Sequence, residues 1–143
     1  MNVWRPSMYE PIRTKSVHTM AEPEPDFPHR SREEELDIRL AGHLTALLTV
    51  TDELRVLTPD PALDEAAERL ADQVVRLRDG SAPLRAAPTT ASADPAHVAA
   101  LHQRAHTLAE WALVIATSRE DAAATALTAE RLEAHAAGLT VAV

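Results

Sequence analysis

The sequence predicts an all-α protein, an antiparallel bundle of three to four helices preceded by a disordered tail. Apolar residues recur at steps of three and four along most of the chain, as they do on the buried face of a helix. The chain has 143 residues, 45% of them hydrophobic but only 3% aromatic, so its apolar content is mainly alanine, leucine and valine. Alanine and leucine favour helix, and three glycines are too few for a turn-rich β fold.

Residues 1–30 are expected to form a flexible tail. Their apolar residues have no period, and five prolines interrupt any helix. Translation could also begin at Met20, so residues 1–19 are open to being non-native. The alternative is a peptide arm that grips a partner through Trp4, Met8, Tyr9 and Ile12.

A first helix is expected over residues 31–57. Ser31 and Glu34 have the spacing of a capping box, and Pro59 stops the helix. One apolar seam runs through it, with a histidine as a member: Leu36, Leu40, His43, Leu47, Val50, Leu54 and Leu57.

A second helix is expected over residues 61–79. Asp60 is its N-cap, Pro61 occupies the first helical position, and Gly80 suits a left-handed C-cap. The short link to the first helix favours an antiparallel hairpin. The linker 80–94 is rich in alanine, proline, serine and threonine and is expected to be a solvated loop.

A third helix is expected over residues 95–117, with Asp94 as its N-cap. A fourth is expected over residues 120–137, with Ser118 and Asp121 near its start and Gly138 at its end. It could instead continue the third helix with a kink. The apolar residues 139–143 are expected to fold back or to contact a partner.

Several classes of function are excluded or disfavoured. Without cysteine there is no disulfide, cysteine nucleophile, thiolate zinc site or iron–sulfur cluster. No P-loop, GxGxxG, GxSxG or Glu-x-x-His motif is present. The net charge of −8 disfavours nucleic-acid binding, and no apolar run has the length of a membrane span. We expect a cytoplasmic protein, because the sequence shows no signal peptide.

His43 is the first candidate for a functional residue. It interrupts an aliphatic seam, and the preceding Gly42 costs the helix about 1 kcal/mol relative to alanine. A glycine inside a helix often permits close approach of a neighbour or ligand. The favoured interpretation is a histidine at the edge of the core, and the alternative is a small-molecule pocket near His43 and Trp111. Trp111 is expected to anchor the core.

A second candidate is a divalent-metal site formed by His102, His106 and Glu110. These residues are spaced i, i+4 and i+8 on the third helix, so their side chains lie on one face. The glutamate of an HExxH motif is missing, since residues 103–105 are Gln-Arg-Ala. A solvated helix face is therefore the favoured interpretation, and no cofactor is expected.

One stretch of the first helix resembles a known family. The matching residues, in order, are Leu40, Gly42, His43, Leu47 and Leu48, then Pro59-Asp60, then residues 71–77, which end in Arg-Leu. The chain is similar here to short actinobacterial helical proteins of unknown function, in which an alanine-rich helix ends in Arg-Leu. These proteins are associated with natural-product biosynthesis. The likeness covers residues 36–117, and the chain departs from the pattern at Thr49 and in the long linker. The resemblance implies a helical fold and draws attention to Gly42 and His43, but it implies no reaction.

The sequence thus favours a non-enzymatic protein that acts through protein–protein interaction or self-association, as an accessory protein in natural-product metabolism. Alanine stripes bury little area per residue, so we expect a homodimer that completes the core. The alternatives are a small-molecule-binding accessory protein that uses Gly42, His43 and Trp111, and a metal-binding protein that uses His102, His106 and Glu110.

Overall fold

The chain from Ser31 onward folds into four helices, described by a computed structural model that covers residues 30–88 and 93–142. The helices are α2 (Arg32–Leu57), α3 (Pro61–Leu77), α4 (Pro95–Ser118) and α5 (Ala122–Ala142), and the described residues contain no strand. The expected tail, with the question of residues 1–19, lies outside the described residues apart from Arg30.

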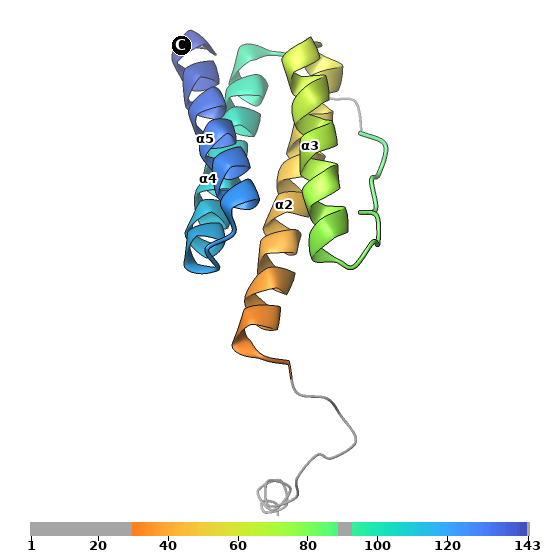
Figure 1. Cartoon of the computed structure of the whole chain (residues 1–143). Coiled ribbons are helices and arrows are strands. Elements are labelled where there is room, and N and C mark those ends of the chain that lie inside the picture. The colour runs from red at the N-terminus through yellow and green to blue at the C-terminus, as the bar shows by residue number, and fades with distance from the viewer. Residues whose placement is uncertain (1–29, 89–92, 143) are drawn as a thin grey trace, which may run out of the picture. The chain divides into compact units, whose positions relative to one another are not determined.

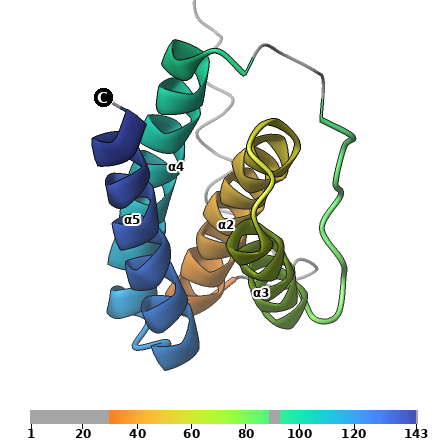
Figure 2. The same ribbon diagram turned by 90° about the horizontal axis from the view of Figure 1, so that it is seen from above.

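The four helices form an antiparallel bundle, as the sequence predicts. Each pair of helices with extensive contacts is antiparallel: α3 and α4 both run opposite to α2, and α5 runs opposite to α4, so α3 and α4 run in the same direction (Figure 1). Figure 2 shows the bundle from above. Helix α2 packs against both α3 and α4, whereas α5 packs mainly against α4 and touches α3 sparsely. Helices α4 and α5 are separate, which decides between the two alternatives left open by the sequence.

The core is built from apolar stripes on the four helices, and the stripe on α2 largely follows the predicted seam. On α2 the fully buried stripe is shifted slightly from the expected one, because it includes Leu44 and Leu48, and His43 lies only half-buried at its edge. The apolar core consists mainly of leucine on α2 and largely of alanine on α4: Leu40, Leu44, Leu47, Leu48, Val50 and Leu54 on α2, Leu63, Ala67, Leu70 and Val74 on α3, Leu101, Ala105, Leu108, Ala109, Ala112 and Ala116 on α4, and Ala124 and Leu127 on α5.

The predicted N-caps of the first three helices are confirmed. Ser31 and Glu34 form both hydrogen bonds of the capping box, at 2.9 and 3.1 Å. Asp60 and Asp94 each accept a hydrogen bond from a backbone N–H two residues on. The second helix ends at Leu77, two residues earlier than expected, because Asp79 already adopts the left-handed conformation with φ 53°.

The boundaries of the last helix differ from the prediction. Asp121, not Ser118, caps it, since its carboxylate accepts a hydrogen bond from the N–H of Ala124 at 3.1 Å. Ser118 is the last residue of α4, and Glu120 turns the chain with φ 56°. The expected end at Gly138 is wrong, because α5 continues to Ala142. The segment expected to fold back thus extends the helix instead, as far as the structure describes it.

The described part of the linker after α3 is attached to α2 through Arg85. The Arg85 guanidinium donates hydrogen bonds to both carboxylate oxygens of Asp52, at 2.7 and 3.1 Å, while Asp52 itself is only 8% exposed. The described part of the expected solvated loop is therefore tethered to α2, along the outer side of the α2–α3 hairpin (Figure 2), although Leu84 is 91% exposed.

None of the helices in the described ranges is both long and apolar enough to cross a membrane.

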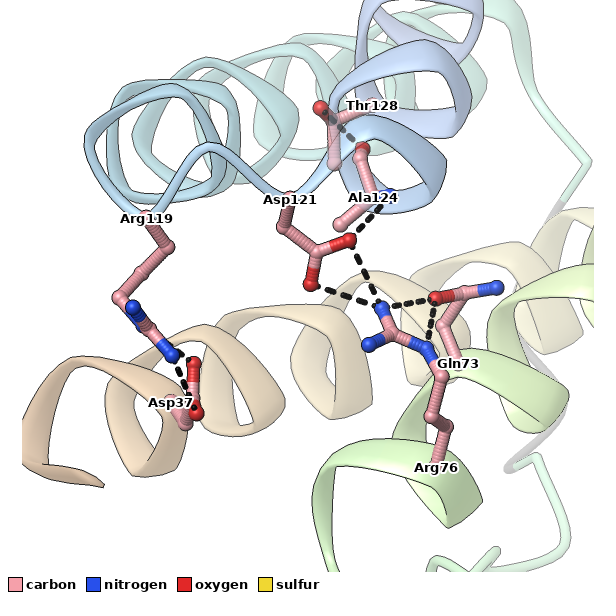
Figure 3. A network of polar contacts seen from close by, with 7 residues as sticks. All are labelled: Asp37, Gln73, Arg76, Arg119, Asp121, Ala124 and Thr128. Carbon is pink, nitrogen blue, oxygen red and sulfur yellow. Dashed lines mark hydrogen bonds and ion pairs between the residues drawn. The ribbon is translucent and has the colours of Figure 1, made fainter. Parts of the chain in front are cut away.

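Two ion pairs tie the α4–α5 turn to the other hairpin (Figure 3). Arg119 donates to both carboxylate oxygens of Asp37 on α2, at 2.8 and 3.2 Å. Arg76 on α3 donates to both oxygens of Asp121, at 2.8 and 3.0 Å. Burial raises the pKa of Asp121, but the hydrogen bonds from Arg76 and the Ala124 N–H outweigh it and lower the pKa below the ordinary value.

Asp121 is therefore expected to stabilise the fold as a cap and as an ion-pair partner. Replacing it in Asp121→Ala should lower the free energy of unfolding by about 1–2 kcal/mol, the usual cost of losing an N-cap. Urea unfolding measures this change. Asp72→Ala on α3 is the control, because Asp72 is exposed and should change stability by less than about 0.5 kcal/mol. Equal effects of the two substitutions would contradict the assignment.

Candidate functional site

The most unusual polar cluster in the bundle lies between α4 and α5. His102 on α4 and His135 on α5 contact each other through their Nδ1 atoms at 3.0 Å. Arg131, one turn before His135, places its Nη2 atom 3.3 Å from the Nε2 atom of His135. Arg131 and His135 are 4% and 1% exposed, so a cation and an imidazole are both buried here.

The protonation of these groups follows from the donor properties of arginine. A guanidinium only donates hydrogen bonds, so the Nε2 atom of His135 must accept from Arg131. A neutral His135 then carries its proton on Nδ1 and donates it to the Nδ1 atom of His102. A neutral His102 in turn carries its proton on Nε2. The three side chains form one directed chain of hydrogen bonds, which we call the Arg131–His135–His102 chain.

The surroundings keep both imidazoles neutral near pH 7. Burial, followed by the charges of Arg131, His102 and His106, lowers the pKa of His135 to about 3. Burial and then Arg131 also lower the pKa of His102 below its ordinary value. Protonating either ring would therefore place a second positive charge beside the buried guanidinium.

Arg131 is incompletely paired. Its Nε atom has no hydrogen-bond partner in the described part of the chain, and its Nη1 atom lies 3.3 Å from a carboxylate oxygen of Glu130. The Glu130 side chain is 47% exposed and also approaches Arg69 on α3, at 3.6 Å. The buried cation thus has one counter-ion, which is half-exposed and shared.

A cavity of about 650 Å³ opens beside this chain. It lies where the α2–α3 turn, the start of α4 and the second half of α5 meet. Its lining comes from all three segments: Thr58, Pro59, Asp60, Ala62, Leu63, Ala93, Pro95, Val98, His102, Glu130, Arg131, Ala134, His135, Ala137 and Gly138. The volume falls within the range of small-molecule sites, roughly 300–1,000 Å³.

Gly138 provides the space that the His102 ring occupies. A Cβ atom built on Gly138 would stand 2.7–2.9 Å from three atoms of the His102 ring, closer than real Cβ contacts allow. Gly138, expected from the sequence to end the helix, therefore serves as a close-approach position inside it.

The structure also brings together the residues of the predicted ligand site. The rings of His43 and Trp111 lie with their centroids 5.6 Å apart and tilted by 59°. Burial and then Arg39 lower the pKa of His43. The expectation that Trp111 anchors the core is wrong, because its side chain is 53% exposed. The cavity of 650 Å³ is not lined by Gly42, His43 or Trp111.

These rings belong to an exposed face on α2 and α4. We define the α2–α4 face by Ile38, Gly42, His43, Trp111 and Val114. Ile38, Trp111 and Val114 are between 52% and 66% exposed, and Gly42 has open space around its missing Cβ. Two contacts join these helices: His43 with Trp111, and Asp37 with Arg119. Ile38 lies between the two contacts along α2, and Val114 lies between them along α4.

The three predicted metal ligands differ in burial and in their partners. Within residues 30–88 and 93–142 no three histidine, aspartate or glutamate side chains gather closely enough to share an ion. His102 uses its Nδ1 atom for His135, while His106 is half-buried and Glu110 is exposed. Metal binding by His102, His106 and Glu110 stays a prediction that no contact between them supports.

Sequence reasoning missed Arg131 and His135. Their positions follow Ala124, Leu127 and Thr128 on one helical stripe, at steps of three and four residues. Extending that stripe would have placed a cation and an imidazole inside the bundle. The contact with His102 could not be inferred, because the sequence does not fix which faces of two helices meet.

We found no match to this chain among protein-family models, curated proteins or solved structures. Its function must therefore be argued from the geometry of the described residues.

The buried His135 predicts a pH-dependent stability. Between about pH 6.5 and pH 3 the unfolded chain binds a proton at residue 135 that the folded chain excludes, so folding should weaken as the pH falls. The free energy of unfolding should drop by up to about 1.4 kcal/mol per pH unit from this group. Above the ordinary histidine pKa the contribution is constant.

Urea unfolding at a series of pH values tests this prediction. His135→Asn, which cannot titrate, should show a shallower slope than the parent chain between about pH 6.5 and pH 4. His97→Asn is the control, since His97 lies outside the Arg131–His135–His102 chain, and its slope should stay closer to the parent value. An unchanged slope in His135→Asn would count against a buried neutral imidazole.

Replacing each of the two helical glycines with alanine should have opposite effects on the free energy of unfolding. Gly42→Ala should stabilise the monomer by about 1 kcal/mol, because alanine favours helix and nothing lies within 4 Å of the new Cβ. Gly138→Ala should lose this gain and destabilise the fold, because the His102 ring must move away from His135. Chemical unfolding at low protein concentration compares the two, and equal stabilisation by both would refute the close approach at Gly138.

Proposed function

We propose that this protein acts by self-association, as a non-enzymatic homodimer joined through the α2–α4 face. One observation carries the proposal: a mid-helix glycine with open space around it lies beside an exposed tryptophan, on a face that also exposes Ile38 and Val114. Gly42 weakens α2, and among the described residues nothing lies within 4 Å of a Cβ built on it, so it fits a role in the approach of a second chain.

The charge distribution favours a second copy as the occupant. A chain with a net charge of −8 repels its own copy, so two copies can meet only through a patch with few charges. The exposed positions of α2 from Ile38 to Thr49 include one charged residue, Arg39. The centres of protein interfaces are depleted of charge and enriched in aromatic side chains such as Trp111.

A two-fold axis that passes beside Gly42 and relates two copies of the chain would bring these weakly charged positions of α2 together. In an antiparallel pair of α2 helices, residues equally far before and after Gly42 face each other. Ile38 of one copy then faces Ala46 of the other, and Glu35 faces Thr49. No like charges are opposed, and glycine at the crossing lets the two backbones come close.

The resemblance to actinobacterial proteins linked with natural-product biosynthesis extends this proposal to an accessory role in such metabolism. In that role the dimer would serve as a binding partner, with no reaction of its own. The proposal itself stands on the α2–α4 face.

Analytical ultracentrifugation tests the proposed dimer. The wild-type chain should sediment at twice its monomer mass of 15.5 kDa. Trp111→Glu and Val114→Glu should each yield monomers with the same helix content, because a charge is placed in the centre of the contact. Leu84→Glu is the matched control and should remain dimeric, since Leu84 is exposed on the linker, outside the α2–α4 face.

Two results would contradict the proposal. One is a wild-type chain that is monomeric at every concentration reached. The other is a dimer that persists in both Trp111→Glu and Val114→Glu, which would place the contact elsewhere.

A further inference from the structure

We propose that the 650 Å³ cavity beside Arg131 is a binding site for a small carboxylic acid with an apolar body, whose carboxylate is held by Arg131 and His102. The cavity is lined by the α2–α3 turn, the start of α4 and the second half of α5, whereas the α2–α4 face lies on the first half of α2 and the second half of α4. The inference is therefore independent of self-association.

The first argument is that the buried charge of Arg131 is incompletely compensated. A guanidinium that is 4% exposed is costly unless hydrogen bonds and an opposite charge compensate it. Here the Nε–H has no acceptor, and the contact of Nη1 with Glu130, at 3.3 Å, is longer than an ordinary charge-assisted hydrogen bond. A carboxylate bound in the adjoining cavity would give Arg131 a fuller counter-charge.

The second argument is the direction of the hydrogen bonds. Because Arg131 donates to His135 and His135 donates to His102, the free nitrogen of neutral His102 carries a proton. This Nε2–H has no acceptor in the described part of the protein. The cavity is therefore lined by two side chains that each have an N–H without an acceptor. A carboxylate could accept from the His102 N–H and bring a negative charge beside Arg131.

The carboxylates that line the cavity are both exposed to solvent. Asp60 accepts a hydrogen bond from the N–H of Ala62 as the cap of α3, and Glu130 is shared between Arg69 and Arg131. Each is thus compensated at the surface, whereas Arg131 is buried. A ligand carboxylate could join or replace Glu130 as the partner of Arg131.

The walls of the cavity define the rest of the ligand. Beyond the polar groups they are largely aliphatic: Ala62, Leu63, Val98, Ala134 and Ala137. An inorganic anion would leave these surfaces uncovered, whereas an apolar body would remove them from water. The site therefore fits an acid whose other end is a hydrocarbon group.

Calorimetric titration with octanoate, and with octan-1-ol as its neutral counterpart, tests the site. Octanoate should bind the wild-type chain saturably and at least tenfold more tightly than octan-1-ol, a difference of about 1.4 kcal/mol. Arg131→Leu should reduce octanoate affinity at least about tenfold while leaving octan-1-ol little changed. Arg104→Leu, which removes an exposed arginine of α4, is the matched control and should bind octanoate like the wild type.

A second variant keeps the test decisive if Arg131→Leu fails to fold. Ala134→Leu adds bulk to the cavity wall without touching the hydrogen-bonding groups, and it should weaken both probes. The proposal is overturned if octanoate does not bind, if it binds no better than octan-1-ol, or if its affinity is unchanged in Arg131→Leu or Ala134→Leu.

Discussion

The leucine stripe of α2 is the constraint on which the rest of the bundle depends. Leu40, Leu44, Leu47 and Leu54 are completely buried, and α2 packs against both α3 and α4. Because leucine side chains fill most of the interior, the facing helix α4 can present alanine and still exclude water. The position of α5 then depends on α4, since α5 has few contacts with α3.

The small residues of α4 and α5 explain why a polar cluster survives inside the bundle. Alanines at 105, 109, 112 and 116 are fully buried and let α4 pack closely, but they contribute little apolar area. Helix α5 adds Thr128, Arg131 and His135 to the interior, where leucines would stabilise the fold better. A buried cation with a free N–H beside a cavity is costly for folding alone, which is consistent with a role in binding.

The two proposed binding sites rely on different interactions. The α2–α4 face offers exposed apolar groups with few charges, which suits a copy of the same acidic chain. The cavity offers a buried positive charge and donors without acceptors, which suits a small acid. The face lies on the first half of α2 and the second half of α4, whereas the cavity is lined by the α2–α3 turn, the start of α4 and the second half of α5. One chain could therefore use both, and variants at Trp111 and Arg131 separate them.

The sequence by itself determined the helical class, the antiparallel α2–α3 hairpin and most helix starts, because these depend on local properties: apolar period, capping side chains and short links. It placed Ser31, Asp60 and Asp94 correctly, and it singled out His43 and His102. Only the tertiary structure decided that Trp111 is exposed, that Gly138 lies inside a helix against His102, and that His135 and Arg131 join His102. These features depend on how far each helix is rotated about its axis when it packs, and that rotation is set by contacts between segments distant in the sequence.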